Sequence, residues 1–280
     1  MSTDNPVVSV VIPCHNSEST IQQTISSVLS QTYSNLEIII YDNCSSDDTA
    51  KIVLNFQDPR IKYYNSNSLL TMSQSWTAAT KLSTGTYVLL LCSDDLLQEN
   101  SISVLLKDFF SNTKLVQIIG RRKLITLNGI LEFTPLFYRV KKKVVLQNKD
   151  VIRKVVHSGS NPFGETLVVL FKRIHLISCL PWSEKYFAHI DVDMYLRVSR
   201  LGESLLIPDI VGKWRFGNTK SSTSKSKDFF IKEFRELILD NYSYLNMRPS
   251  TPLLVFALAK SSAKRTIRHS IVKSVAFLKL

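Results

Sequence analysis

The sequence lacks most of the short motifs that identify nucleotide-binding and metal-binding proteins. Its eight glycines form no G-x-G-x-x-G, which disfavours a dinucleotide-binding Rossmann domain, and no G-x-x-x-x-G-K-[ST], which excludes a P-loop enzyme. It has neither a serine nucleophile elbow nor the H-E-x-x-H zinc motif. The four cysteines are widely separated and form no C-x-x-C pair, so we expect free buried thiols instead of a zinc site or a redox pair.

Targeting and membrane-spanning segments are also missing from the sequence. The first residues, MSTDNP, contain neither the basic region nor the apolar core of a secretory signal. The longest late apolar stretch, residues 253–259, is too short to cross a bilayer. These two absences predict a cytoplasmic protein.

Acidic residues are absent from residues 241–280, which hold seven of the Lys and Arg residues. The net charge of the chain is +12, and the first 240 residues contribute only +5 of it. A basic chain can bind nucleic acid, but no helix-turn-helix, zinc-finger or RNP pattern accompanies these bases. We therefore expect no nucleic-acid partner, and the basicity is largely a property of the tail.

The first hundred residues alternate between apolar runs and helical patterns. Continuous β-branched runs suit strands that are buried on both faces of a parallel sheet, and they occur at 7–12, 36–40 and 87–91. A shorter strand is expected at 61–64. Helices are expected at 17–30, at 72–82 and after Ser45 or Ser46, either of which can cap a helix. This order predicts an α/β fold with a doubly wound, mostly parallel sheet.

The second half is less regular. Further strands are expected at 115–119, 123–127, 167–171, 205–207 and 211–216. Helices are expected at 193–201 and 229–239. The Ser-, Thr- and Lys-rich residues 217–227 predict a loop that could close over a site.

Acidic residues follow the fourth predicted strand. In an open parallel sheet, ligands bind beyond the carboxyl ends of the strands. Turn chemistry explains Asp47 and Asp48, which follow the second strand, but it explains Asp94 and Asp95 poorly because they come straight out of a core strand. A carboxylate pair in that position is costly unless a cation lies near it. Oxygen ligands of this kind suit Mg²⁺ or Mn²⁺.

Together these motifs resemble glycosyltransferase family 2, the inverting transferases with a GT-A fold. The resemblance rests on VSVVIPCHNSESTIQQTISSVLSQTYSNLEIIIYDNCSSDDT, GTYVLLLCSDDLL, NPFGETLVVLFKR and HIDVDMYLRVSRLGE. It implies a Rossmann-like GT-A sheet with helices on both faces. It also implies a transferase domain over 1–225, with a nucleotide-binding half at 1–100 and an acceptor half at 101–225. Residues 226–280 lie beyond it as a basic helical extension.

The resemblance also implies roles for particular residues on the donor side. Pro13 and His15 would line the pocket for the nucleotide base. Asp42 and Asn43 would hydrogen-bond the base or the ribose, although the family more often has a second Asp where Asn43 stands.

The same resemblance assigns the metal and the base. Asp94, the second Asp of the D-x-D motif, would ligate Mg²⁺ or Mn²⁺, and Asp95 is an additional carboxylate at the donor. Asp191 would be the general base, and Arg197 would brace its helix. Two departures stand out: Cys92 replaces the first Asp of D-x-D, and the family's later His is missing after Trp214-Arg215-Phe216.

The function implied is transfer of a sugar from a nucleotide-sugar, with UDP ahead of dTDP or GDP, to a saccharide or lipid-linked saccharide acceptor. Such an enzyme would take part in cell-surface polysaccharide or glycolipid biosynthesis. Two alternatives remain open. One is a nucleotidyltransferase of related fold, and the other is an inactive glycosyltransferase-like binding protein.

The basic tail predicts a further partner. Apolar residues recur at helical spacing, at Ile267, Ile271, Val275 and Leu278. Bases lie between them, at Lys264, Arg265, Arg268 and Lys273. A helix of this kind over 252–280 can lie on an anionic membrane surface, which predicts a peripheral position on the cytoplasmic face of the membrane. The alternative is a helix that packs on the catalytic domain with its bases in water.

Overall fold

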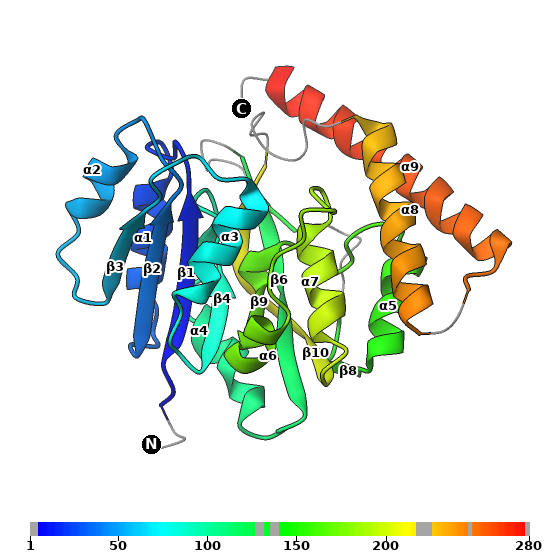
Figure 1. The fold of residues 1–280 in the computed structure, drawn as a ribbon, viewed down its shortest axis with the longest axis horizontal. Helices are drawn as coiled ribbons and strands as arrows, with labels where there is room; N and C mark the ends of the chain where they lie inside the picture. The colour runs from blue at the N-terminus through cyan, green and yellow to red at the C-terminus, as the bar shows by residue number, and fades with distance from the viewer. Residues whose placement is uncertain (1–4, 127–131, 135–139, 217–225, 246–247, 278–280) are drawn as a thin grey trace.

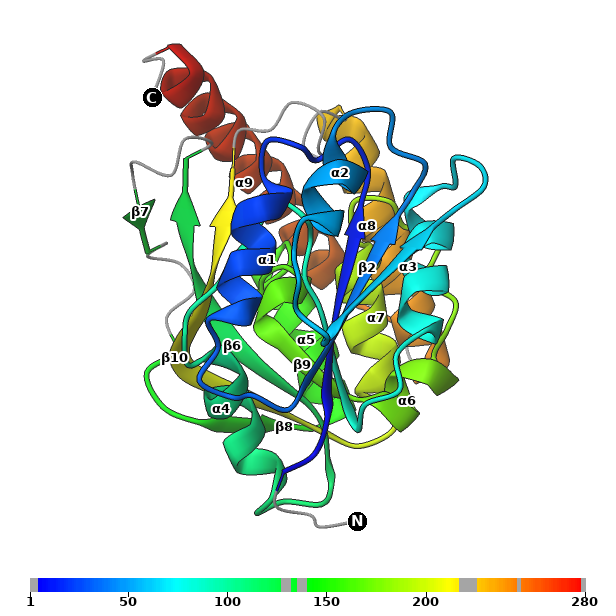
Figure 2. The ribbon, with the colours of Figure 1, turned by 90° about the vertical axis from the view of Figure 1, so that its left-hand side faces the viewer.

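The structure is a computed structural model that describes residues 5–126, 132–134, 140–216, 226–245 and 248–277. Its centre is one mixed sheet with helices on both faces (Figure 1). Figure 2 shows α1 and α4 on one face of the sheet and α3, α6 and α7 on the other. This arrangement confirms the α/β prediction.

The first half contains the four parallel strands that the apolar runs predict. In chain order its elements are β1 (Val8–Cys14), α1 (Ile21–Leu29), β2 (Leu36–Asp42), α2 (Thr49–Leu54), β3 (Ile61–Asn65), α3 (Met72–Lys81) and β4 (Tyr87–Leu90). Every residue of β1 and β4 is buried, as strands covered on both faces must be.

The second half begins with β5 (Leu96–Leu97), α4 (Ser101–Leu106), η1 (Lys107–Phe109), β6 (Leu115–Ile125), β7 (Glu132–Phe133), β8 (Val144–Leu146) and α5 (Asn148–Ser158). It continues with η2 (Thr166–Val168), β9 (Val169–Lys172), α6 (Arg173–Ser178), α7 (Ile190–Val198), β10 (Glu203–Arg215), α8 (Lys227–Tyr244) and α9 (Thr251–Phe277).

The strand order is β3-β2-β1-β4-β9-β6-β10-β5, with β7 added to β6 and β8 added to β10. β9 is antiparallel to both of its neighbours, β4 and β6, and it joins the two halves of the sheet. β6 and β10 then run parallel to each other through two register shifts around Ile210.

Three local predictions need correction. The strands expected at 115–119 and 123–127 are one strand, β6, and those expected at 205–207 and 211–216 are one strand, β10. Their interruptions are register shifts between paired strands, which leave the pairing intact on both sides. The helix after β2 is not capped by Ser45 or Ser46. Asp47 accepts the backbone N–H of Thr49 at 3.0 Å instead. The loop expected over 217–227 falls largely outside the described residues.

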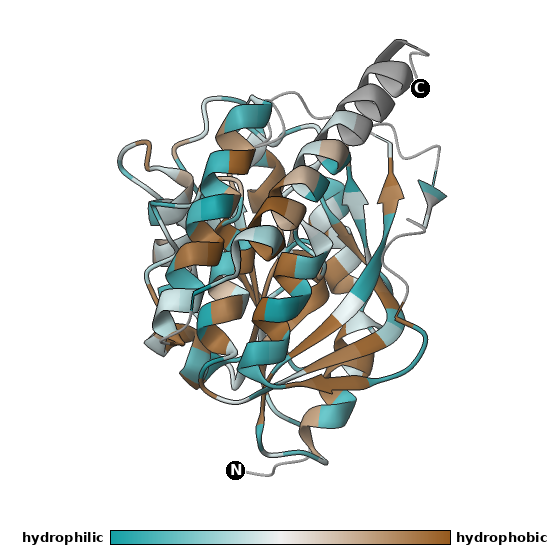
Figure 3. Ribbon diagram, turned by 90° about the vertical axis from the view of Figure 1, so that its right-hand side faces the viewer, coloured by the Kyte–Doolittle hydropathy of each residue, from teal (hydrophilic) through white to brown (hydrophobic). Residues whose placement is uncertain are grey.

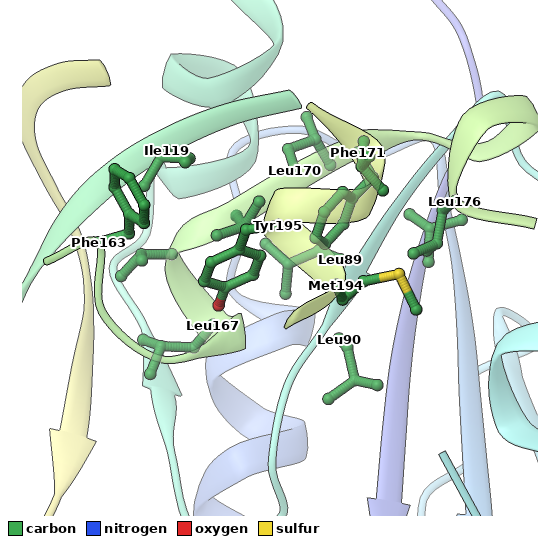
Figure 4. Close-up of a cluster of buried hydrophobic side chains, with 14 of the residues drawn as sticks. Leu89, Leu90, Ile119, Phe163, Leu167, Leu170, Phe171, Leu176, Met194 and Tyr195 are labelled. Atoms are coloured by element: carbon green, nitrogen blue, oxygen red, sulfur yellow. The ribbon is translucent and has the colours of Figure 1, made fainter. Parts of the chain in front are cut away.

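One hydrophobic core runs through the sheet and the helices that cover it. Figure 3 shows hydrophobic strands beneath helices that carry both hydrophobic and hydrophilic residues. Figure 4 shows Tyr195 of α7 between Phe163, Phe171 and Leu167, with Leu89 and Leu90 of β4 nearby. The Tyr195 hydroxyl donates to the carbonyl of Gly164 at 3.1 Å, so this buried polar group has a partner. α7 is thereby fixed against the centre of the sheet.

The two C-terminal helices pack against α5 and against each other. α8 places Phe234, Leu237 and Ile238 in the common core. α9 buries Ala257 against Gly159, which has φ +68° at the end of α5 and whose added Cβ would lie 2.8 Å from the backbone N of Ser261. The first part of α9 therefore packs on the domain. The domain boundary at 225 stays a prediction.

The side chains of Ile267, Ile271 and Val275, and the whole of Leu278, lie outside the described residues. The predicted apolar stripe on the tail therefore stays a prediction. Among the described residues, none of the helices combines the length and the apolar composition needed to span a membrane.

Candidate active site

A cavity of about 950 Å³ opens at the carboxyl ends of β1 and β4. Five of the seven predicted site residues line it: Pro13, His15, Asp94, Asp95 and Asp191. Segments far apart in the sequence therefore meet where an open parallel sheet is expected to bind its ligand. Trp214 and Arg215 at the end of β10 and Phe230 of α8 are among the residues from the second half of the chain that also line it.

The other two predicted site residues, Asp42 and Asn43, are buried behind this cavity. The carboxylate of Asp42 accepts the backbone N–H of Ser45 at 3.0 Å and the hydroxyl of Tyr63 at 2.9 Å. The amide of Asn43 forms two hydrogen bonds of 2.9 Å with the backbone of Leu70. Both side chains hold loops at the ends of β2 and β3. Their direct contact with a nucleotide stays a prediction.

Asn43 also orients His15. The Nδ1 of His15 donates to the carbonyl oxygen of Asn43 at 2.8 Å. The Nε2 of the same ring accepts from the side-chain amide of Asn16 at 3.3 Å. Asn16 has φ +47° and its side chain also accepts the backbone N–H of Ser46 at 2.8 Å. The loops after β1 and β2 therefore form one hydrogen-bonded unit that presents the imidazole to the cavity.

Asp94 and Asp95 have different surroundings. Asp95 is 1% exposed and accepts the backbone N–H of Arg215 at 3.0 Å, which ties the end of β4 to the end of β10. Burial, followed by the adjacent charge of Asp94, raises the pKa of Asp95 well above its usual range. Asp94 is half-buried and lines the cavity. Of the pair, Asp94 is therefore the carboxylate that a ligand in the cavity can reach more easily.

Cys92 occupies the place of the first Asp of D-x-D. Its thiol lies 3.9 Å from the hydroxyl of Thr166. Burial and then the charges of Asp95 and Asp94 raise the pKa of the thiol well above its usual range, so Cys92 is neutral. Within the described residues, no three His, Cys, Asp or Glu side chains are grouped so that they could hold a metal ion by themselves.

Asp191 lies in the first turn of α7, where a carboxylate is stabilised by the helix dipole. One carboxylate oxygen accepts the backbone N–H of Val192 at 2.7 Å, and the other accepts the side-chain amide of Asn161 at 2.7 Å. Burial and then the charge of Glu165 nevertheless raise the pKa of Asp191 to about 7. A carboxylate with this pKa can both lose and gain a proton near neutral pH.

An ion pair between Glu165, which also lines the cavity, and the buried Arg122 lies near Asp191. Glu165 accepts from the Nη2 of Arg122 at 3.0 Å and also pairs with its Nε. Arg122 lies over the ring of Trp214, 5.7 Å from its centroid. Gly164 has φ +101°, and a Cβ there would lie 2.8 Å from Nη1 of Arg122, so only glycine fits. The sequence motifs did not identify Asn161, Glu165 or Arg122 as site residues, although two of them lie in the segment NPFGETLVVLFKR.

Two further contacts concern packing around the site. Trp182 is fully buried against Trp76, with ring centroids 5.2 Å apart, while Trp76 also lines the cavity. Arg197 braces α7, as expected. It donates to Asp193 at 2.8 Å and to the backbone carbonyl of Pro181 at 3.0 Å. These bonds tie α7 to the segment that precedes it.

The fold is a mixed sheet covered by helices, with a cavity lined by carboxylates and other polar side chains at the carboxyl ends of its parallel strands. This arrangement places the chain among the GT-A-type folds. Residues 9–153 match the family model described as Glycosyl transferase family 2. This match covers more than half of the chain, and the chain belongs to that family.

Individual relatives agree with this assignment. Over 128 residues, the chain is 34% identical to the Escherichia coli UDP-Glc:alpha-D-GlcNAc-diphosphoundecaprenol beta-1,3-glucosyltransferase WfgD. The aligned part covers 46% of this chain and 50% of that protein, so the chain spans about half the length of this relative.

Two solved structures share the fold. Residues 1–349 of S. aureus TarS in complex with UDP-GlcNAc superpose with a TM-score of 0.70 and 17% identity, covering 91% of this chain and 71% of that one. The mannosyltransferase PcManGT from Pyrobaculum calidifontis, in complex with GDP-Man and Mn²⁺, gives a TM-score of 0.61 and 14% identity, covering 93% and 70%.

Proposed function

We propose that the chain is an inverting glycosyltransferase that moves a sugar from a UDP-sugar to an acceptor hydroxyl. The observation that carries the proposal is that Asp94 and Asp191, which are far apart in the sequence, line one cavity. Inverting transfer has two separate tasks: the negative charge on the leaving diphosphate must be offset, which a cation held by a carboxylate can do, and the attacking hydroxyl must lose its proton to a base. Membership of glycosyltransferase family 2 supports the same reaction.

Asp191 is the proposed general base. As the acceptor oxygen attacks the anomeric carbon, its proton passes to the carboxylate of Asp191. The bond from the anomeric carbon to the diphosphate oxygen breaks in the same displacement, so the configuration inverts and the nucleoside diphosphate leaves. A pKa of about 7 suits this role because the base is available at neutral pH and still holds a proton well.

Asp94 is the proposed protein ligand of Mg²⁺ or Mn²⁺ at the donor diphosphate. Mg²⁺ commonly binds one or two carboxylates and completes its shell with substrate phosphates and water, so a single reachable carboxylate suits it. The raised pKa of Asp95, which Asp94 helps to cause, is a second sign that a cation at this position would be favourable. When bound, the cation would offset the negative charge that develops on the leaving diphosphate.

The nucleotide base is proposed to lie against Pro13 and His15, which line the cavity at the end of β1. UDP is the proposed nucleotide because WfgD is named for UDP-Glc and TarS was solved with UDP-GlcNAc. Asp42 and Asn43 support this pocket by holding its loops, and their hydrogen bonding to the base or ribose remains part of the proposal.

The proposed acceptor is a lipid-linked saccharide in cell-surface polysaccharide or glycolipid biosynthesis. The name of WfgD, whose substrate carries diphosphoundecaprenol, supports this class of acceptor. We further propose that the basic tail at 252–280 meets an anionic membrane surface, which would place the protein at the cytoplasmic face of the membrane. The bases of this tail are not offset by any acidic residue.

The membrane proposal is tested by co-sedimentation with anionic vesicles at low salt. Because the start of α9 packs on the domain, substitution is a cleaner test than truncation. Replacing Arg265, Arg268 and Lys273 by Gln should strongly reduce vesicle binding. Equal binding by both proteins would remove the tail from the interaction.

The transferase proposal is tested by following UDP release from UDP-glucose in the presence of a lipid-diphosphate-linked GlcNAc acceptor. The Asp191→Asn variant should lower turnover by about 10²-fold or more with UDP affinity nearly unchanged. UDP-sugar binding without transfer would favour the inactive binding protein, and release of pyrophosphate in place of UDP would favour a nucleotidyltransferase.

A further inference from the structure

The segment between α6 and α7 forms part of the cavity wall. Phe187, Ala188 and Ile190 line the cavity directly ahead of Asp191. Residues 179–189 form neither helix nor strand, so their backbone amides need partners outside the regular hydrogen-bond patterns. The position of this wall, and of the α7 start that follows it, therefore depends on the side chains that bind these amides.

Glu233 of α8 supplies two of these partners. Its Oε1 accepts the backbone N–H of Phe187 at 2.8 Å, and its Oε2 accepts the backbone N–H of Ala188 at 2.9 Å. Both carboxylate oxygens are therefore directed at consecutive amides of the wall. Hydrogen bonds to a charged acceptor are shorter and stronger than neutral ones, so this contact holds the backbone firmly.

The surroundings of Glu233 suit a carboxylate with this task. The residue is 6% exposed. In the described part of the chain, no Lys or Arg lies within salt-bridge distance of it, and its charged or polar side-chain partner is Nδ1 of His189 at 3.2 Å. The ring of His189 packs between Phe230 and Phe234, with centroids 5.9 and 5.5 Å away. The carboxylate of Glu233 therefore interacts with the two amides, with His189 and with the nearby N-terminus of α7.

We propose that Glu233 is a positioning residue of the catalytic centre, which fixes the cavity wall at Phe187 and Ala188 and thereby the carboxylate of Asp191. The clamp lies three residues before Asp191, and no glycine intervenes to absorb a displacement. The backbone N–H of Asp193 bonds the carbonyl of His189 at 2.9 Å, so the clamped segment runs directly into the first turn of α7. The role at Asp191 rests on the function proposed above.

This arrangement makes α8 part of the active site. Phe230, one turn before Glu233, lines the cavity itself. The same helix face therefore contributes one side chain to the cavity and one to the support of its wall. A positioning role predicts that loss of Glu233 lowers the rate of the chemical step. Donor binding, which is proposed to depend on residues that follow β1 and β4, should be unchanged.

The test compares Glu233→Ala and Glu233→Gln with a matched control, Glu236→Ala. Glu236 is an acid on the same helix with a half-buried side chain. Hydrogen–deuterium exchange at the amides of Phe187 and Ala188 reports the clamp without any need for activity. Calorimetry with UDP and MnCl₂ reports donor binding, and kcat and KM are measured with UDP-glucose and the lipid-linked acceptor.

In Glu233→Ala, exchange at both amides should rise by about tenfold or more, because the opening of the segment costs less. Glu233→Gln keeps the side-chain volume but turns a donor toward one of the two amides, so exchange should rise mainly at one of them. Turnover of Glu233→Ala should fall by about 10- to 100-fold with UDP affinity within about twofold. Glu236→Ala should match the wild type.

Unchanged exchange at both amides in folded Glu233→Ala or Glu233→Gln protein would overturn the clamp. Faster exchange with unchanged kcat would overturn the link to Asp191 alone. If the wild type itself transfers no sugar, the proposed function fails, while the exchange result still decides whether Glu233 holds the wall.

Discussion

Replacing Glu165 by glutamine tests whether the charge of this neighbouring carboxylate helps to set the proton affinity of the proposed base, Asp191. The pKa of Asp191 is raised from 3.8 to about 7, first by burial and second by the charge of Glu165. Each pKa unit corresponds to about 1.4 kcal/mol, so the ionised form of Asp191 is disfavoured by roughly 4 kcal/mol relative to an exposed Asp. Only the ionised form can take a proton, so activity should rise with pH with a midpoint near 7.

Glu165→Gln removes the neighbouring negative charge and leaves the cation of Arg122 in place. The loss of the negative charge and the retained positive charge both favour the ionised form of Asp191, so the pKa of Asp191 should fall. Removing a close like charge typically shifts a carboxyl pKa by about 1–2 units, so the midpoint should move to roughly pH 5–6. It should stay above the ordinary value of an Asp, because burial, the larger cause, remains.

The assay is the initial rate of UDP release at saturating donor and limiting acceptor, measured between about pH 5 and about pH 9 so that the acid limb of kcat/KM is defined. Glu184→Gln, an exposed substitution, serves as the matched control and should keep the wild-type midpoint. Thermal unfolding checks that the variants remain folded. A Glu165→Gln protein that is folded and active but keeps the wild-type midpoint would refute the reasoning.

Three further predictions follow from other parts of the structure. Asp94→Asn should abolish Mn²⁺-dependent binding of UDP while leaving the melting temperature nearly unchanged, and undiminished affinity would remove Asp94 from the donor site. Calorimetry should rank UDP above GDP, CDP and dTDP, and a clear preference for GDP or CDP would contradict the proposed donor. Burial alone would raise the pKa of Glu37, but bonds from Lys62, Ser9 and Thr84 outweigh it and lower the pKa to about 2. The ionised Glu37 therefore stabilises the fold fully above about pH 4.5, and this contribution, on the order of 3 kcal/mol, is lost as the pH falls toward 2. Glu37→Gln should flatten that acid limb in urea unfolding, and an unchanged limb would show that the ionised carboxylate contributes nothing.

The first hundred residues were the predictable part of the fold. Its strands are continuous β-branched runs, and such runs fix both the element type and its burial, so β1, β2 and β4 begin and end close to the predicted residues. The carboxyl ends of parallel strands share one sheet edge, which is why Asp94 and His15 could be placed at one cavity from spacing alone. Asp191 was assigned to the site only through the family resemblance. Its position depends on α7, and no strand of the first hundred residues indicates it.

The support of the site was not predictable, because it depends on contacts between distant segments. Asn161 bonds Asp191 across 30 residues, and Glu233 bonds the cavity wall across more than 40. One signal for Glu233 was available. It lies on the apolar face of its helix, among Phe230, Phe234 and Leu237, where an acid is rarely buried without a partner. The partner itself could not be read from the pattern.

The position of β9 in the sheet limits which fragments of the protein can fold. The segment that matches the family, residues 9–153, ends before β9, yet in the described sheet β9 is the strand that joins β4 to β6. A fragment cut to that match would lack β9. The edges of β4 and β6 that pair with β9 would then have no partner strand. An exposed apolar strand edge such as that of β4 templates intermolecular pairing, so such a fragment should aggregate when expressed. The segment that matches the family model is therefore not expected to fold alone, because the sheet needs a four-residue strand that lies outside it.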